Sequence, residues 1–197
     1  MPDQPADRTA HTRVPIHPPI AARWSPRAFD PDAVITAEQL VALLEAGRWA
    51  ATWGHREPVR FVVGRRGEAA FEAVSGLLRR GNSYAKAAGA LIVVCADEGE
   101  DDRTALYSGV DAGAAMANMA IEAVSRGLIA HPMAGFDVDG ARETFGLPEG
   151  VRPLAVVAVG SLGDYRHMPP EIVERDSRPR DRVPLEAMVL NWSGTGL

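Results

Sequence analysis

The sequence predicts a single layered domain of the α/β or α+β class. Two apolar runs, ALIVVCA at residues 90–96 and PLAVVAVG at residues 153–160, have the composition of central strands covered on both faces of a sheet. Residues 104–128, between these runs, have the spacing of a long helix. With 197 residues, of which 46% are hydrophobic, the chain is long enough for one compact domain and its core. A second full domain is not expected.

The elements before the first apolar run can be assigned in order. Residues 1–20 are predicted to be a flexible arm, because prolines lie there among polar residues. A helix follows, since Thr36 and Gln39 have the spacing of a capping box and precede a leucine-rich apolar face. Residues 59–64 (VRFVVG) are predicted to form a short strand, and residues 68–80 have helical spacing.

The long helix predicted over residues 104–128 has one narrow polar stripe. Its polar residues recur at intervals of seven, four and four, at Asp111, Asn118, Glu122 and Arg126. The rest of its surface is apolar or small, so we expect the helix to be enclosed on most of its circumference. Its many alanines and glycines suit either a crowded core within the chain or a helix pair across a dimer axis.

After the long helix, HPMAGFD at residues 131–137 is predicted to be a loop. Asp137 can cap a helix over residues 138–145, and Gly146 with Pro148 can end it.

Charge and composition exclude several classes of partner. The 26 acidic residues outnumber the 21 basic ones, so no basic field draws DNA or RNA. The N-terminus has no apolar signal core, and no run reaches the roughly 18 apolar residues of a membrane helix. Cys95 is the single cysteine and lies in an apolar run, which predicts a buried, inert thiol in a cytoplasmic protein. The histidines lack metal-ligand spacing, so no metal site is expected.

Two arginine clusters suggest an anion site. Arg23, Ser25 and Arg27 lie on one segment, RWSPRAF, that Pro26 keeps extended, and two guanidinium groups and a hydroxyl there can converge on a phosphate. A second cluster near the other end alternates along the chain, at Arg178, Arg180 and Arg182. The alternative is that these arginines pair with acidic side chains or form a solvated charge run.

Taken in order, these pieces resemble the FMN-dependent nitroreductase family. The resemblance covers about residues 20–192 and rests on the order and spacing of RWSPRAFDP, LLEAGRWAATWGHREPVRFVV, GNSYAKAAGALIVV, DAGAAMANMAIEAVSRGL, HPMAGFD, RPLAVVAVGSLGD and RDRVPLEAMV. It implies a homodimer of α+β subunits, each with a mixed central sheet flanked by helices and a long helix in the dimer core. It also implies one domain over residues 21–197, whose C-terminal segment PLEAMVLNW reaches the partner, and one FMN in each of two pockets at the subunit interface.

The resemblance also assigns roles to individual residues. Those expected to hold the FMN phosphate and ribityl chain are Arg23, Trp24, Ser25 and Arg27, together with the late basic pair Arg180 and Arg182. Asn82 is expected to hydrogen-bond the flavin ring, and Asp111 can line it. The main chain of Pro132, Met133, Ala134 and Gly135 is expected to face the reactive N5 edge. On residues alone, Asn82 is equally a loop-capping side chain, and residues 132–135 are an ordinary turn.

One stretch departs from the family. The usual pattern resembles P-S-x-x-N-x-Q-P-W, whereas this chain has ATWGHREPV at residues 51–59. Thr52 can replace a serine hydroxyl, and Trp53 can border the pocket. His55 and Glu57, however, stand where amides are common in the family. An amide can donate a hydrogen bond, whereas the carboxylate of Glu57 cannot unless it is protonated. The stretch either recognises an unusual substrate, weakens FMN binding and turnover, or pairs internally and serves structure only.

By this resemblance, the chain is an FMN-dependent oxidoreductase that takes a hydride from NAD(P)H and reduces a small organic acceptor by a ping-pong mechanism. Nitroaromatics, quinones and enones are the expected acceptors, and no side chain is expected to be catalytic, because the flavin carries the chemistry. The alternatives are a flavin-binding or flavin-storage protein without turnover, and a flavin-dependent dehydrogenase of a natural product. Tyr84, Asp111 and His131 are possible acid–base residues, although nothing in the sequence brings them together.

Overall fold

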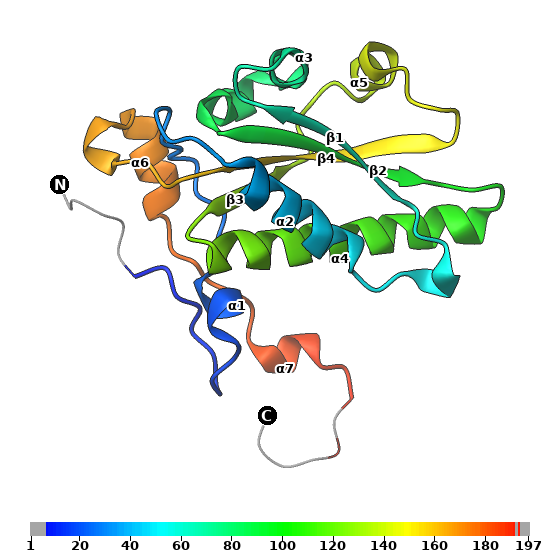
Figure 1. Cartoon of the computed structure of the whole chain (residues 1–197). Helices are drawn as coiled ribbons and strands as arrows, with labels where there is room; N and C mark the ends of the chain where they lie inside the picture. Colours follow the sequence, from blue (N-terminus) through cyan, green and yellow to red (C-terminus); the bar gives the residue numbers. More distant parts are fainter. Residues whose placement is uncertain (1–6, 192, 194–197) are drawn as a thin grey trace.

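A four-stranded antiparallel sheet forms the centre of the structure (Figure 1), a computed structural model that describes residues 7–191 and 193. The strands are β1 (Val59–Arg65), β2 (Ala90–Asp97), β3 (Ile129–Met133) and β4 (Val151–Gly160). Their order is β1-β2-β4-β3, and every neighbouring pair runs antiparallel. The mixed sheet that the family resemblance implied would need a parallel neighbour, which no strand within the described residues supplies.

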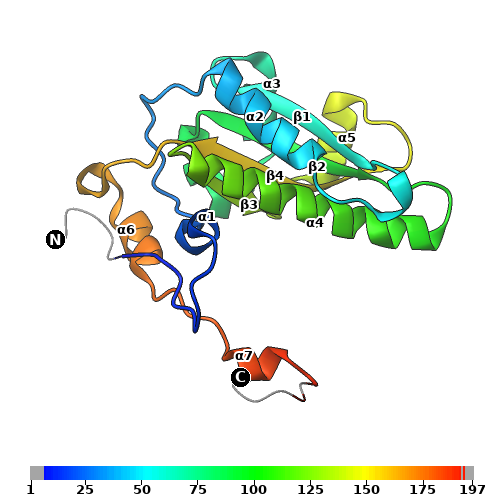
Figure 2. The same ribbon diagram turned by 60° about the horizontal axis from the view of Figure 1, so that its bottom comes forward.

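Helices cover both faces of this α+β sheet (Figures 1 and 2). On one face lie α2 (Ala37–Arg48) and α4 (Asp102–Ser125), and on the other lie α3 (Ala69–Leu77) and α5 (Val138–Phe145). Three short 3-10 helices connect the layers: η1 (Trp53–His55), η2 (Arg80–Ala87) and η3 (Tyr165–His167). The two helix layers confirm the layered domain that the sequence predicts.

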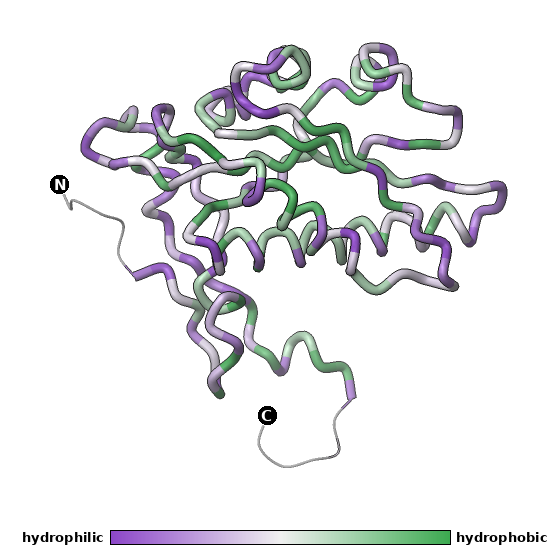
Figure 3. Tube along the Cα trace, viewed as in Figure 1, coloured by the Kyte–Doolittle hydropathy of each residue, from purple (hydrophilic) through white to green (hydrophobic). Residues whose placement is uncertain are grey.

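Strand β2 is buried on both faces, as its sequence predicts. Val93 points into the core shared with α3 and α5, whereas Ile92 and Val94 point into the core shared with α2 and α4. Figure 3 shows hydrophobic residues concentrated in the strands of the sheet. Cys95 is fully buried in this strand, and burial raises the pKa of its thiol to about 11, which confirms the prediction of an inert thiol.

The predicted helix ends are also confirmed. The backbone N–H of Gln39 donates to Thr36 Oγ1 at 3.1 Å, and Thr36 N–H donates to Gln39 Oε1 at 3.0 Å, which completes the capping box of α2. Asp137 Oδ1 accepts from Gly140 N–H at 3.0 Å at the start of α5. Gly146 ends α5 with φ of 55°, a left-handed conformation that favours glycine.

The loop predicted over residues 131–137 is wrong in its first part, because residues 131–133 complete strand β3. Pro132 lacks a backbone N–H, which disfavours a central strand. β3 is an edge strand, however, and within the described residues pairs with β4 alone, so its outer row of N–H groups needs no partner in the sheet. The loop begins only after Met133.

The polar stripe of α4 is only partly buried. Asp111 is 5% exposed, and Asn118 Nδ2 donates to the carbonyl of Ala46 at 3.1 Å, so these two residues face α2 and the loop that follows it, whereas Glu122 and Arg126 pair with each other nearer the surface. The exposed surface of α4 is apolar, with Leu106 66% and Val110 59% exposed. Within one chain, the helix is therefore not enclosed on its apolar side. No helix in the described part of the chain is long and apolar enough to cross a membrane.

The described segments before α1 and after α6 lie side by side below one end of α4 (Figures 1 and 2). The N-terminal end carries the short helix α1 (Pro18–Ala22), so the predicted boundary of the arm falls inside a helix. The C-terminal end carries α6 (Pro170–Ser177) and then α7 (Leu185–Met188), which stands away from the body of the molecule (Figure 2). Residues 1–6 of the predicted arm, and Trp192 at the end of the segment expected to reach a partner, lie outside the described residues.

Candidate functional site

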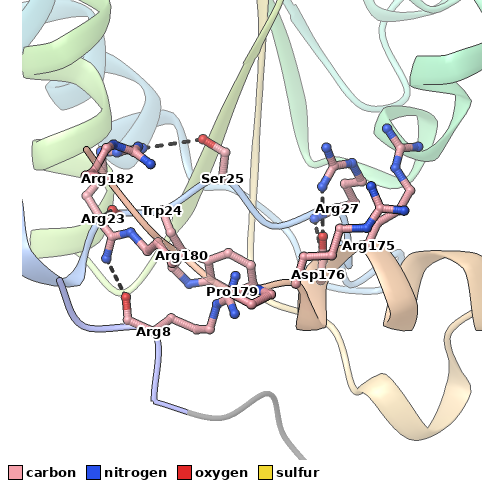
Figure 4. Close-up of a pocket in the computed structure, with 11 residues that line it drawn as sticks. Arg8, Arg23, Trp24, Ser25, Arg27, Arg175, Asp176, Pro179, Arg180 and Arg182 are labelled. Carbon is pink, nitrogen blue, oxygen red and sulfur yellow. Dashed lines mark hydrogen bonds and ion pairs between the residues drawn. The ribbon is translucent and has the colours of Figure 1, made fainter. Parts of the chain in front are cut away.

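The two basic segments, which are far apart in the sequence, meet at one cavity (Figure 4). Residues 23–27 follow α1, and residues 178–182 follow α6. The cavity between them has a volume of about 220 Å³. Its lining is rich in arginine and comprises Arg8, Arg23, Trp24, Ser25, Arg27, Arg175, Asp176, Arg178, Pro179, Arg180 and Arg182. The convergence that the arginine clusters suggested is therefore present.

Asp176, near the end of α6, holds the two segments together. Its side chain is 1% exposed, and Oδ2 accepts hydrogen bonds from the backbone N–H groups of Arg27, at 2.7 Å, and Ala28, at 3.2 Å. The Tyr165 hydroxyl donates to the same oxygen at 2.9 Å. A carboxylate is stable in such a place only when donors replace water, as they do here. Sequence analysis missed Asp176, because one acidic residue among arginines carries no recognisable signal.

Two of the predicted phosphate ligands are engaged within the protein. Arg27 Nη1 forms an ion pair with Asp176 Oδ1 at 3.2 Å. Arg180 donates to the backbone carbonyls of Arg23, at 2.5 Å, and Ala21, at 2.8 Å. Arg180 therefore fixes the path of the segment after α1, and its charge stays in the cavity without an acidic partner among the described residues.

Arg23, Ser25 and Arg182 form the part of the cavity that remains open to a ligand (Figure 4). Arg23 Nη1 lies 3.4 Å from Ser25 Oγ, and no acidic side chain in the described part of the chain neutralises Arg23 or Arg182. Burial lowers the pKa of Arg23, and the charge of Arg182 lowers it further. Burial and the charges of Arg23 and Arg182 likewise lower the pKa of Arg180. An anion at this place would relieve the repulsion.

The predicted arm contributes a residue that sequence analysis missed. Arg8 lines the cavity, and its guanidinium lies 4.7 Å from the ring centre of Trp24, which packs on the small core beside α6. The carbonyl of Arg8 accepts a hydrogen bond from Arg180, and Ala10 N–H donates to the carbonyl of Ala21 at 2.9 Å. The arm is thus attached to the wall of the cavity.

Asn82 and the loop after β3, both expected to contact the flavin ring, lie together. Asn82 Nδ2 donates to the carbonyl of Gly135 at 2.9 Å, and Arg79 N–H donates to the same carbonyl at 3.0 Å. A Cβ atom on Gly135 would lie 2.6 Å from Asn82 Nδ2, so a larger residue there would force the Asn82 amide to move and would disturb this hydrogen bond. Pro132 and Ala134 are exposed there, whereas Met133 is buried. Asn82 therefore uses its amide N–H to bind the loop, and its side-chain oxygen has no donor among the described residues.

Two of the three possible acid–base residues are hydrogen-bonded to each other. Tyr84 OH lies 3.0 Å from His131 Nε2, and His131 Nδ1 lies 2.9 Å from the carbonyl of Pro26. A carbonyl only accepts, so Nδ1 carries the proton and Nε2 accepts from Tyr84. Burial raises the pKa of Tyr84 to about 12 and lowers that of His131, so both groups are neutral near pH 7. Asp111 lies elsewhere.

Protonation of His131 should make stability depend on pH. Because the pKa of His131 is lowered on folding, the unfolded chain binds more protons below its ordinary pKa of about 6.5, and the free energy of unfolding falls as pH falls there. The loss is at most about 1.4 kcal/mol per pH unit. We expect urea unfolding at pH 7.5 and 5.5 to show a steeper loss for the wild type than for His131→Asn. Equal pH dependence of the two proteins would contradict this assignment.

The remaining predicted residues lie at the other end of α4. Both oxygens of Asp111 accept from the backbone N–H of Trp53, at 3.1 and 3.2 Å, and the Trp53 ring stacks on Tyr107 at 5.0 Å. Thr52 and His55 flank this group in the cyan segment, which Figures 1 and 2 place at the opposite end of the molecule from α1. One chain therefore does not bring these residues to the arginine cavity.

The stretch that departs from the family has an unusual backbone. His55 and Glu57 have φ angles of 60° and 46°, in the left-handed region that favours glycine. Within residues 7–191 and 193, neither side chain forms a hydrogen bond or ion pair. Arg56 instead donates to Thr104, so the alternative that His55 and Glu57 pair with each other or with Arg56 is not what the structure shows. Such strain is common at ligand sites.

The sequence of this chain is similar to those of known proteins. A sequence model of the nitroreductase family matches residues 20–86 and 78–161. A 15.4 kDa protein of Mycolicibacterium smegmatis is 63% identical over 136 residues, which are 65% of this chain and 92% of that protein.

Solved structures agree. An oxidoreductase containing FMN superposes with a TM-score of 0.85 at 31% identity, over 97% of this chain and 98% of that one. A protein from Desulfovibrio desulfuricans in complex with FMN has a TM-score of 0.71 at 24% identity, over 88% of this chain and 94% of that one, and shares the fold. With the family match spanning well over half of its length, the chain belongs to the nitroreductase family of oxidoreductases.

Proposed function

We propose that this chain binds FMN and uses it to pass electrons from NAD(P)H to a small organic acceptor, such as a nitroaromatic, a quinone or an enone. The observation that carries the proposal is the cavity where Arg23, Ser25 and Arg182 converge, and in the described part of the chain no acidic side chain pairs with either of these two arginines. The FMN held by an oxidoreductase that is 31% identical over almost the whole chain supports the same cofactor.

The cavity suits the phosphate of FMN. Two guanidinium groups, on Arg23 and Arg182, and the hydroxyl of Ser25 are the donors that a phosphate dianion accepts from. The Nε atoms of Arg8 and Arg27 are buried and lack a hydrogen-bond partner in the described part of the chain, which is costly unless a ligand or water supplies one. The donor set therefore fits the cofactor.

The loop after β3 suits the ring of FMN. Within the described residues Asn82 Oδ1 has no hydrogen-bond donor, and the bond from Nδ2 to Gly135 fixes the orientation of the amide, so Oδ1 could accept from a ring N–H. β3 is an edge strand, so the main-chain groups on its outer side near Pro132 have no strand partner in the described part of the chain. FMN, when bound, would supply the redox centre that takes electrons from the nicotinamide donor and returns them to the acceptor. The residues of this chain would anchor the phosphate and orient the ring.

A homodimer would complete the site. The exposed face of α4, with Leu106, Val110, Gly113 and Ala117, is apolar and small enough for close helix packing against a second copy. Pairing along α4 would carry the partner's Trp53–His55 segment toward the arginine cavity. We therefore propose that each FMN pocket uses both subunits.

Placing a charge on this face should separate the subunits. Val110→Asp puts a carboxylate where the dimer would bury an apolar side chain, at a position 59% exposed in one chain, so the monomer itself should stay folded. We expect sedimentation equilibrium to show a dimer for the wild type and a monomer for Val110→Asp. Val34→Asp, on another surface at 80% exposure, is the control and should remain dimeric. A wild-type monomer, or a dimeric Val110→Asp, would contradict the assignment.

Turnover distinguishes an enzyme from a flavin store. With FMN and a quinone present, the wild type should oxidise NADPH or NADH steadily, with the initial-rate pattern of a ping-pong mechanism. A storage protein would give at most one reduction per bound flavin. Failure of both nicotinamides to reduce the bound flavin would overturn the proposed electron donor.

A further inference from the structure

Strand β3 and its loop are held at two points by η2 and the residue before it. In the loop, Asn82 Nδ2 and Arg79 N–H donate to the carbonyl of Gly135. In the middle of the strand, the Tyr84 hydroxyl donates to His131 Nε2 at 3.0 Å. The residues that the proposed function places against the flavin ring, 132–135, extend from the residue after the second attachment to the first.

His131 also ties the strand to the phosphate segment. Its Nδ1 donates to the carbonyl of Pro26 at 2.9 Å, and Pro26 lies between Ser25 and Arg27. His131 is 8% exposed and uses both ring nitrogens, so its ring has one tautomer and one orientation. The pair of Tyr84 and His131 therefore joins the segment that would hold the phosphate to the segments that would hold the ring.

The same network reaches the C-terminal part of the cavity. The guanidinium of Arg27 lies 5.7 Å from the ring centre of Tyr84, and Arg27 pairs with Asp176 on α6. Two apolar rings of similar size could fill this volume, although the carbonyl of Pro26 would then lose its donor, so packing alone does not need a hydroxyl paired with an imidazole here. The hydrogen bonds of Tyr84 and His131 add a fixed distance between the phosphate segment at Pro26 and the segments that would hold the ring.

We infer that Tyr84 and His131 are positioning residues, which set where the main chain of residues 132–135 lies against the flavin ring relative to the phosphate site. The inference rests on the proposed function. Neither residue touches the ring in this account. Their effect is on the geometry of electron transfer, and a small displacement of a reacting group is enough to slow a reaction strongly.

Two single variants and their double variant test this role. Tyr84→Phe removes the hydroxyl and keeps the ring, and His131→Asn keeps a donor for Pro26 but cannot reach Tyr84. We expect each to slow the reduction of bound FMN by NADPH or NADH about tenfold and to shift the visible band of the bound flavin, while the dissociation constant for FMN changes less than about threefold. The double variant should be no slower than either single variant, because both remove one interaction.

Tyr165→Phe is the matched control. It also removes one buried phenol, but that phenol donates to Asp176 on the phosphate side. We expect weaker FMN retention, with an unchanged band and an unchanged reduction rate for the flavin that remains bound. Wild-type rate and spectrum in Tyr84→Phe, or equal slowing by Tyr165→Phe, would overturn the inference while the proposed function stands. If the wild type binds no FMN, both the proposed function and this inference are wrong. If FMN binds but is not reduced, the shift of the visible flavin band in the variants is the measurement that tests the inference.

Discussion

Replacing Arg23 and Arg182 together with alanine is expected to raise the dissociation constant for FMN about a hundredfold to ten-thousandfold. A hydrogen bond to a charged group contributes about 1.5–3 kcal/mol, and each 1.4 kcal/mol is about a factor of ten in affinity. The fold should persist, because the two guanidinium groups repel each other in the free protein. Fluorescence titration with FMN measures the affinity, and urea unfolding checks the fold.

Arg126 and Arg166 offer the control for this double substitution. Both are surface arginines with acidic neighbours, Glu122 and Asp164. Replacing these two by alanine removes the same net charge and should leave FMN affinity almost unchanged. If Arg23→Ala with Arg182→Ala behaved like this control, the phosphate assignment would be wrong.

Replacing Asp176 with alanine is expected to cost about 3–5 kcal/mol of the free energy of unfolding, the range for removing one partner of a buried ion pair. The change leaves the backbone N–H of Arg27 and of Ala28, the Tyr165 hydroxyl and the Arg27 guanidinium without their acceptor. FMN affinity should fall as well, since the two basic segments lose the contact that joins them. Urea unfolding with and without saturating FMN measures both effects.

Asp164 is the matched control for this substitution. Its carboxylate also binds an arginine, and the hydrogen bonds from Arg166 hold its pKa at about 2, but it lies at the surface. Surface pairs contribute little to stability, so Asp164→Ala should destabilise the protein far less. Similar unfolding curves for the two variants would contradict the structural role of Asp176.

The fold was predictable where local chemistry determines the structure. The capping box at Thr36, the glycine at position 146 and the apolar run of β2 act through neighbouring residues, and each is confirmed. β3 was not predictable in the same way. Its last residues include Pro132, which is typical of a loop, and only their place at the edge of the sheet permits a strand. The burial of Asp111 on α4 likewise depends on a distant partner, the loop at Trp53.

The candidate site was likewise predictable only where neighbouring residues determine it. Alternating arginines indicated an anion site, but the sequence does not say which arginine is engaged within the protein. Arg27 pairs with Asp176 and Arg180 binds carbonyls, and these partners lie well over one hundred residues away in sequence. The contact between Tyr84 and His131 spans 47 residues and depends on the packing of η2 against β3. Such long-range pairs have no local pattern.

The arginine cavity is proposed to bind the phosphate of a flavin nucleotide. Parallel equilibrium titrations of the full chain with FMN and riboflavin would test this role, because riboflavin has the same ring and lacks the phosphate. We expect FMN to bind at least about a hundredfold more tightly, from charge-assisted hydrogen bonds to two guanidinium groups, and we expect added salt to weaken the binding of FMN only. Equal affinity for FMN and riboflavin, or no binding of either, would contradict it.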